Sequence, residues 1–193
     1  MLEPVTLEGR FVKLVPLSLD HLDGLSHVGL EPELWRWIPQ QVASRDEMRG
    51  YIQTALDEQK AGISLPFAVL DAASGEAIGS TRYGNINLPN KRVEIGWTWY
   101  AKTRQRTPVN TEAKLLLLTH AFERLGLIRV ELKTDTLNDK SRAAIARIGA
   151  TQEGIFRKHL ICESGRVRDT VYFSILDSEW PDRKRRLLER LDS

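Results

Sequence analysis

The sequence predicts a mixed α/β fold in which about seven strands form one twisted, mostly antiparallel sheet. Segments with a period of two residues alternate along the chain with segments of helical period. A long helical segment, residues 111–125, lies between strand segments at 92–100 and 128–134, and a strand–helix–strand connection joins parallel neighbours. The other strand segments follow one another through short turns, which favours antiparallel pairing. About four helices and a C-terminal helix are expected around the sheet.

The first sixty residues are predicted to form one strand and two helices. Residues 9–16 alternate apolar and polar side chains and end in a proline, as in a strand. Ser18 and Ser44 stand where helix-capping residues are preferred, and a glutamate three residues after Ser44 completes a capping-box pattern. We expect helices over residues 19–28 and from 44 to about 56, with a loop or broken helix over 31–41.

Three strands are predicted next, over residues 65–70, 77–83 and 92–100, separated by turn sequences. In a regular strand successive side chains point to opposite faces of the sheet. The third strand therefore places Val93, Ile95, Trp97 and Trp99 on one face, and Glu94, Gly96 and Thr98 on the other.

The last third of the chain is predicted to alternate helices and strands. The helix over 111–125 ends at Gly126, and its inner stripe is Ala113, Leu116, Leu117, His120, Ala121 and Leu125. A strand over 128–134 and a helix over 139–148 follow. Residues 153–162 and 168–176 are expected to form a hairpin that turns at 163–166, before a basic amphipathic helix at 178–193.

Composition is that of a soluble globular protein, with 41% hydrophobic and 28% charged residues. A length of 193 residues fits a single domain, and a net charge of +2 does not by itself indicate nucleic acid or a membrane as partner. Cys162 is the one cysteine, so no disulfide within the chain and no multi-cysteine metal site can form. The histidines show no metal-ligand spacing. Without a signal peptide or an apolar run of about 18 residues, we expect a cytoplasmic protein.

The polar loop at residues 101–110 feeds the long central helix. Unpaired N–H groups at the start of a helix, together with its dipole, suit a phosphate group. Arg104 and Arg106 add two cations with bidentate geometry. The residues alone are equally compatible with a phosphate site and with a solvated basic loop.

Several segments resemble the GCN5-related N-acetyltransferases (GNAT). They are Gln105 to Ala113, Phe122-Glu123-Arg124-Leu125-Gly126, Arg129-Val130-Glu131, Asn138, Ser141 and Ile148-Gly149-Ala150. Three others, Glu94-Ile95-Gly96-Trp97, Thr111-Glu112-Ala113 and Glu153-Gly154-Ile155-Phe156-Arg157, resemble the RimJ/RimL-like branch that acetylates ribosomal-protein N-termini. These motifs cover about residues 92–176, and the order of elements agrees over nearly the whole chain. The resemblance implies a GNAT fold and acetyl-coenzyme A as cosubstrate, with no metal.

The resemblance also implies where coenzyme A binds. Its pantetheine arm would pair with the backbone of Ile95, Gly96 and Trp97, at a point where that strand parts from its neighbour, and would contact Asn138. The pyrophosphate would be held by Arg104, Gln105, Arg106, Thr107, Val109, Asn110 and Thr111. Arg142 and Arg147 would reach the adenosine phosphates or would simply be exposed helix arginines.

The chain departs from the family signature in the pyrophosphate loop. The usual pattern is Gln or Arg, two residues, Gly, one residue, then Gly or Ala; here Gln105 matches, but Pro108 and Asn110 hold the small positions. Proline has no N–H, so one expected donor to the pyrophosphate is missing. Side chains of the loop could compensate. An alternative is therefore a coenzyme A-binding or sensing domain with weak or no turnover.

Amine acetylation needs a base, because an ammonium group has no lone pair. Glu94 is the candidate; alternatively it forms a structural salt bridge with Arg82 or Arg92. Many family members protonate the departing thiolate with a tyrosine at the position of Ile145, so Ser141 is the candidate here, as in the ribosomal-protein branch. Direct attack in a ternary complex needs no protein nucleophile. Cys162 is accordingly assigned a structural role.

The amine acceptor is the least determined part. Trp35 and Trp37 lie in the region that walls the acceptor cleft in this family, and Arg82, Tyr83 and Asn85 would reach the same cleft; the tryptophans could equally be core residues. The acceptor is expected to be a protein N-terminus, with a ribosomal protein as partner, or a small-molecule amine. A homodimer is possible. The basic helix could contact RNA or be a solvated surface, and a nucleic-acid interaction module is the last-ranked alternative.

Overall fold

The computed structural model describes residues 1–192, and its eight strands form one sheet in the order β1-β2-β3-β4-β5-β6-β8-β7. The strands are β1 (Leu7–Glu8), β2 (Val12–Pro16), β3 (Leu65–Asp71), β4 (Ala77–Asn87), β5 (Arg92–Tyr100), β6 (Arg129–Asp135), β7 (Thr151–Ile161) and β8 (Val167–Leu176). The helices are α1 (Leu22–Gly29), α2 (Pro32–Trp35), α3 (Arg45–Lys60), α4 (Val109–Thr119), α5 (Asp139–Arg147) and α6 (Trp180–Asp192). β5 and β6 are parallel and the other pairs antiparallel, which confirms the predicted mixed sheet.

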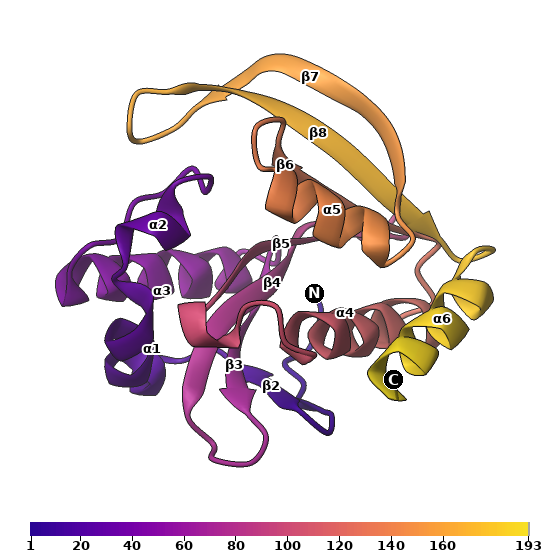
Figure 1. The fold of residues 1–193 in the computed structure, drawn as a ribbon, viewed down its shortest axis with the longest axis horizontal. Helices are drawn as coiled ribbons and strands as arrows, with labels where there is room; N and C mark the ends of the chain where they lie inside the picture. Colours follow the sequence, from indigo (N-terminus) through magenta and orange to yellow (C-terminus); the bar gives the residue numbers. More distant parts are fainter. Residues whose placement is uncertain (193) are drawn as a thin grey trace.

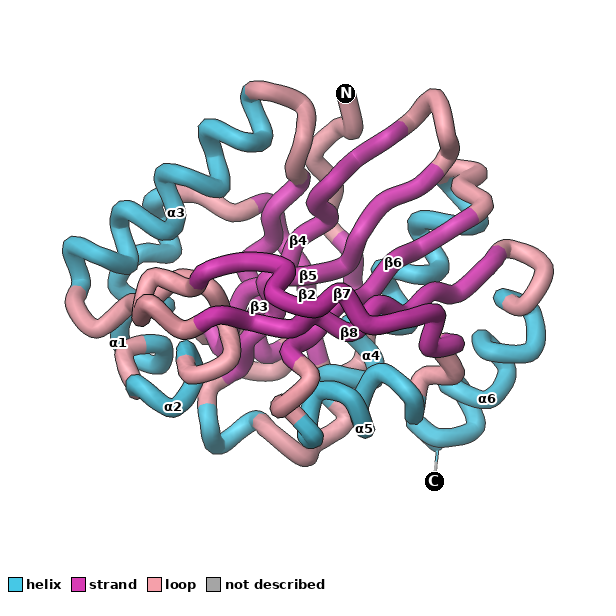
Figure 2. Tube along the Cα trace, turned by 90° about the horizontal axis from the view of Figure 1, so that it is seen from above, coloured by secondary structure: helices cyan, strands magenta, loops and turns pink. Residues whose placement is uncertain are grey.

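Helices cover the two faces of the sheet at different places. α1, α2 and α3 lie together at the left of Figure 1, and α4, α5 and α6 lie at the right. One core cluster joins α1 and α3 to β3 and includes Leu25, Met48 and Ile52; the larger one lies between the sheet and α4 and includes Leu117 and Val130. The β7–β8 hairpin extends above both groups of helices, and the view from above shows the strands running between them (Figures 1 and 2).

The predicted alternation along β5 fails at Trp97. Trp97 and Thr98 together lie opposite the single residue Thr81, so β5 carries a β-bulge, and Trp97 has a left-handed φ of 49°. One extra residue exchanges the two faces for everything that follows it. Val93 and Ile95 pack in the α4 core as predicted, whereas Trp99 is buried in the core of α1 and α3.

The central helix differs from its prediction at both ends. α4 begins at Val109, two residues before the predicted Thr111, and a π-helical turn, His120–Arg124, follows Thr119. Its buried surface is also wider than the predicted stripe, because α4 is packed between the sheet and α6. Leu116 is only partly buried, while Glu112, Lys114, Leu115 and Leu118 are buried.

The outer strand β7 is interrupted near its middle. Its residues 157–159 lie opposite Asp169 alone, and Lys158 has a φ of 49°. The backbone N–H of Lys158 donates to the Asp169 carboxylate at 2.6 Å, so this side chain replaces the missing ladder bond. The turn that joins β7 to β8 lies at 162–166, as predicted, and contains the buried thiol of Cys162.

Glu112 ties α4 to the first two strands. Its carboxylate accepts hydrogen bonds from the backbone N–H groups of Arg10, Phe11 and Val12, at 2.8, 2.6 and 2.8 Å. The predicted strand over 9–16 is therefore observed only over Val12–Pro16, as β2; residues 9–11 form the turn, and β1 precedes it. Gly9 leaves room for the carboxylate, since a Cβ there would lie 2.4 Å from the Glu112 side chain.

We expect Glu112→Ala to lower the free energy of unfolding by about 3 kcal/mol, because it leaves buried N–H groups without acceptors. Urea denaturation measures this change. Glu189→Ala, an exposed glutamate of α6, is the control and should change stability by less than about 0.5 kcal/mol. A loss below about 1 kcal/mol for Glu112→Ala would contradict the assigned role.

Candidate functional site

The strands β5 and β6 part immediately after Glu94. Their parallel pairing covers Arg92 to Glu94 on β5 and Arg129 to Glu131 on β6. Beyond that point β5 continues beside β4 to Tyr100, and β6 continues beside β8 to Asp135. Among the described residues, the edge of β5 that faces β6 therefore has no strand partner from Ile95 onward. This is the parting that the resemblance implied.

Two helices begin at the end of the sheet where these strands part. α4 follows the carboxyl end of β5 and α5 follows that of β6, so both positive helix ends lie beside the opening. The first-turn N–H groups of α4 belong to Val109, Asn110 and Thr111, and no side chain caps them strongly; the hydroxyl of Thr107 lies 3.4 Å from the first. These groups are donors for an anion.

Several predicted anion ligands in the loop are already engaged within the protein. Arg104 pairs with Asp71 at the end of β3, with 2.9 Å between Nη1 and Oδ2. Gln105 donates from Nε2 to the Tyr100 carbonyl at 3.3 Å, and Thr107 donates to the Arg104 carbonyl at 2.7 Å. Arg106 is exposed and holds a left-handed φ of 61°.

Asn138 caps α5 at the other side of the opening. Its Oδ1 accepts from the Ser141 N–H at 3.1 Å, which leaves its amide Nδ2 without a partner in the described chain. The half-buried Ser141 stands in the first turn of α5, and Ile145 is buried one turn later. Arg142 donates to the Thr136 carbonyl at 3.2 Å, whereas Arg147 is exposed.

Glu94 lies at the point of parting, with 6% of its surface exposed. Its Oε2 accepts from Asn85 Nδ2 at 2.6 Å and from Lys133 Nζ at 2.7 Å. Its Oε1 has no partner in the described chain and lies beside Gly96, where a Cβ would come within 3.0 Å. Burial lowers the pKa of Lys133, but the charge and hydrogen bond of Glu94 outweigh it, so this pKa is raised overall.

The arginines proposed as structural partners of Glu94 pair elsewhere. Arg82 donates to Glu58 of α3, and Arg92 donates to Glu131. The ion-pair partner of Glu94 is instead Lys133 of β6. Alternation within β5 shows which face Glu94 lies on but not which residue of another strand lies beside it.

Two of the predicted acceptor contacts are core residues. Trp35 is 1% exposed and donates from Nε1 to the Gly29 carbonyl at 2.7 Å. Tyr83 is fully buried on the opposite face, where its hydroxyl donates to the Leu117 carbonyl. Both side chains are thus packed in the two core clusters, Trp35 with α1 and α3 and Tyr83 with α4.

The other three predicted acceptor contacts differ in accessibility. Arg82 is 2% exposed and lies between the rings of Tyr51 and Trp97, 5.1 Å from each centroid. Trp37 is half-buried and covered by the guanidinium of Arg166, while Asn85 is exposed and bound to Glu94. Asn85 is thus the predicted acceptor residue that the structure brings to the candidate base.

Lys114 is a buried cation that the sequence analysis missed. It is 6% exposed, and its Nζ donates to Thr98 Oγ1 on β5 at 3.0 Å. Burial lowers its pKa to about 7. A lysine in a helix is normally expected to be exposed. The one signal in the sequence was its neighbour Ala113, which belongs to the predicted inner stripe and indicates that this side of α4 faces the sheet.

The basic α6 is occupied by ion pairs. Arg185 and Arg186 contact Asp182, Arg185 also contacts Glu189, and Lys184 contacts Glu123 of the π-helical turn. These contacts favour a packed surface helix over an RNA-binding one.

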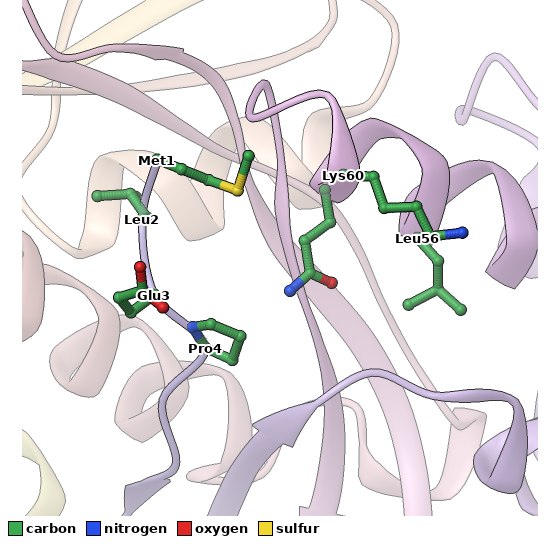
Figure 3. Close-up of a pocket in the computed structure, with 7 residues that line it drawn as sticks. Met1, Leu2, Glu3, Pro4, Leu56 and Lys60 are labelled. Carbon is green, nitrogen blue, oxygen red and sulfur yellow. The ribbon is translucent and has the colours of Figure 1, made fainter.

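A separate apolar hollow of about 350 Å³ lies between the N-terminal segment and the end of α3 (Figure 3). Residues 1–4 line one side, and Leu56, Gln59 and Lys60 line the other. It contains none of the predicted site residues and is distinct from the opening beside Glu94.

The free strand edge, the two helix starts and the buried carboxylate belong to one α/β domain with an open mixed sheet. The acetyltransferase (GNAT) domain model matches residues 12–151. The chain belongs to this family.

Individual relatives agree with this assignment. YdaF of Bacillus subtilis, which is named as a ribosomal N-acetyltransferase, is 38% identical over 110 residues, or 57% of this chain and 59% of that protein. A GCN5-related N-acetyltransferase from Brucella melitensis superposes with a TM-score of 0.89 at 36% identity, covering 98% and 86% of the two chains. Mycobacterium smegmatis RimJ in complex with CoA-disulfide superposes with a TM-score of 0.84 at 25% identity. The match covers 97% of this chain and 95% of that chain.

Within residues 1–192, the helices lack an apolar stretch of the length that spans a membrane. In the same part of the chain, no group of three or more His, Cys, Asp or Glu side chains could hold a metal ion.

The pKa of Lys114 makes stability depend on pH. Between pH 7 and 10.5 the unfolded chain keeps a proton on this lysine that the folded chain has lost, so stability rises with pH in that window. We expect Lys114→Met to be the more stable protein at pH 7, with its advantage shrinking by about 2 kcal/mol by pH 9. Urea denaturation of both proteins across this range measures the difference, and a constant difference would show that the lysine remains charged.

Proposed function

We propose that this protein transfers an acetyl group from acetyl-coenzyme A to a primary amine by direct attack within a ternary complex. The observation that carries the proposal is the parting of β5 from β6 between two helix starts, with Glu94 at its apex. Family membership and the coenzyme A derivative bound to RimJ support it.

The residues at the opening fit acetyl-coenzyme A. The pantetheine arm would add to the free edge of β5 along Ile95 to Trp97, where its amides can replace the missing strand ladder. The first-turn N–H groups of α4 would bind the pyrophosphate, and the free Nδ2 of Asn138 would donate to a pantetheine carbonyl. The thioester would then lie near Glu94.

Glu94 would accept the proton of the acceptor amine. Asn85 and Lys133 bind the same oxygen, so Oε1, which lies beside Gly96, has no partner among residues 1–192. The neutral amine then attacks the thioester carbon, and collapse of the tetrahedral intermediate breaks the carbon–sulfur bond. The second proton of the nitrogen passes to the departing coenzyme A thiolate, which leaves as the thiol. Ser141 would donate a hydrogen bond to that thiolate from the first turn of α5.

A protein N-terminal α-amine is the acceptor that we favour, because YdaF is named as a ribosomal N-acetyltransferase and the candidate base Glu94 is nearly buried. An extended peptide end reaches such a site more easily than a bulky side chain. Small-molecule amines are the alternative acceptors.

Replacement of the base separates chemistry from binding. We expect Glu94→Gln to lower kcat for thiol release at least 100-fold and to leave the affinity for acetyl-coenzyme A within about twofold. Thiol detection and calorimetric titration measure the two quantities. Glu153→Gln is a matched control on β7. Unchanged turnover in Glu94→Gln would remove this residue from the mechanism.

The acceptor class is tested by a panel of substrates. Short peptides with free N-termini should release thiol from acetyl-coenzyme A faster than the same peptides with blocked N-termini and one internal lysine, and faster than polyamines. Mass spectrometry of the products locates the acetyl group. Binding of acetyl-coenzyme A without turnover on any amine would instead favour a sensing domain, for which the missing N–H of Pro108 is the structural argument.

A further inference from the structure

The ammonium group of Lys114 is buried without any carboxylate partner. Its contact is the hydroxyl of Thr98, which is itself 2.7 Å from the hydroxyl of Thr81. No ion pair within 4.0 Å engages this lysine anywhere in residues 1–192, whereas the other buried charges of the site, Glu94 and Arg82, are paired. One neutral hydrogen bond does not offset the desolvation of a cation.

The side chains that face Lys114 from the sheet supply no negative charge at neutral pH. Thr81 and Thr98 have neutral side chains. The titratable groups on this face of β4 and β5 are Tyr83 and Tyr100, and burial raises the pKa of the two tyrosines. His120, in the π-helical turn after α4, supplies no negative charge, and burial and Arg124 lower its pKa. Glu112 is turned the other way, onto the β1–β2 turn.

The general tilt of helix side chains brings the ammonium group of Lys114 closer to the start of α4 than its Cα atom is. Lys114 stands five residues after Val109, a rise of about 7.5 Å. Its contact Thr98 lies on β5 beyond Glu94, in the part of that strand with a free edge. The ammonium group thus lies between α4 and the part of β5 beyond the parting.

The loop before α4 has few cations left for a diphosphate. Arg104 forms an ion pair with Asp71, and the hydroxyl of Thr107 donates a hydrogen bond to the Arg104 carbonyl. Pro108 contributes no N–H at the position where the helix begins. A diphosphate at this helix start would therefore meet the N–H groups of the first turn and the exposed Arg106, without a fixed, desolvated positive charge from the loop.

We propose that Lys114 is a cosubstrate-binding residue whose ammonium group pairs with the diphosphate of coenzyme A from inside the protein. This inference rests on the proposed function. The diphosphate would supply the anionic partner that the buried ammonium group lacks. The ammonium group would in turn replace the hydrogen-bond donor to the diphosphate that is missing at Pro108. Pairing favours the charged form of the lysine, so binding takes up a proton above pH 7.

The test compares wild type, Lys114→Met and the exposed-surface control Lys60→Met by calorimetric titration. Acetyl-coenzyme A is the ligand, because its thioester does not titrate, and S-acetylpantetheine is the matched ligand without phosphate. We expect Lys114→Met to lose at least tenfold in affinity for acetyl-coenzyme A and less than twofold for S-acetylpantetheine. Lys60→Met should bind both ligands as the wild type does.

The pH dependence is the second readout. Wild-type affinity for acetyl-coenzyme A should fall about tenfold from pH 7 to 9, where phosphates are fully ionised, and that of Lys114→Met should stay flat. Lys114→Arg, which keeps the charge at every pH, should restore affinity at pH 9.

Two outcomes overturn the inference. Equal affinity of folded Lys114→Met and wild type for acetyl-coenzyme A excludes the contact, and an equal loss for both ligands places the lysine on the pantetheine arm instead. Failure of the wild type itself to bind acetyl-coenzyme A at millimolar concentration would refute the proposed function and is recognisable before any variant is made.

Discussion

The parallel strands β5 and β6 remain paired only from Arg92 to Glu94, and each then follows a different neighbour. A sheet normally satisfies its backbone groups internally, so an opened ladder needs another partner. The same separation brings the starts of α4 and α5 to one opening and places Glu94 at its closed end. Strand edge, helix dipoles and carboxylate thus derive from a single break in the sheet.

Buried charges hold the elements around this break in place. Glu112 fastens α4 to the first hairpin, and Lys133 with Asn85 fixes one oxygen of Glu94. Arg82, between two aromatic rings and bound to Glu58, joins α3 to the sheet on the Glu94 face. Each of these charges has a close partner. Lys114 stands apart from them because its contact is the neutral hydroxyl of Thr98 and not a charged group.

The fold was largely predictable because its strands and helices have clear periods and sharp turns. Errors arose where tertiary structure changed a local rule: the bulge at Trp97 exchanged the faces of β5, and packing on both sides of α4 buried Lys114. The sequence named Glu94, Asn85, Asn138 and Ser141 as site residues, but not Lys133, which pairs with Glu94, or Asp71, which pairs with Arg104. Lys133 and Asp71 come from other strands, and no spacing in the sequence reveals such pairs.

The irregular outer strand bears on how the molecule behaves at high concentration. An unpaired edge is a template onto which a second polypeptide can add and continue the sheet. In β7 the left-handed Lys158 and the hydrogen bond from its N–H to Asp169 break that template midway, although Ile155 and Phe156 are exposed beside it. An incoming strand would meet two short segments of β7, one on each side of residues 157–159, whose hydrogen-bonding registers do not match. The charges of Arg157 and Lys158 lie between these segments. Growth into stacked, fibre-like aggregates is hindered by geometry and charge together.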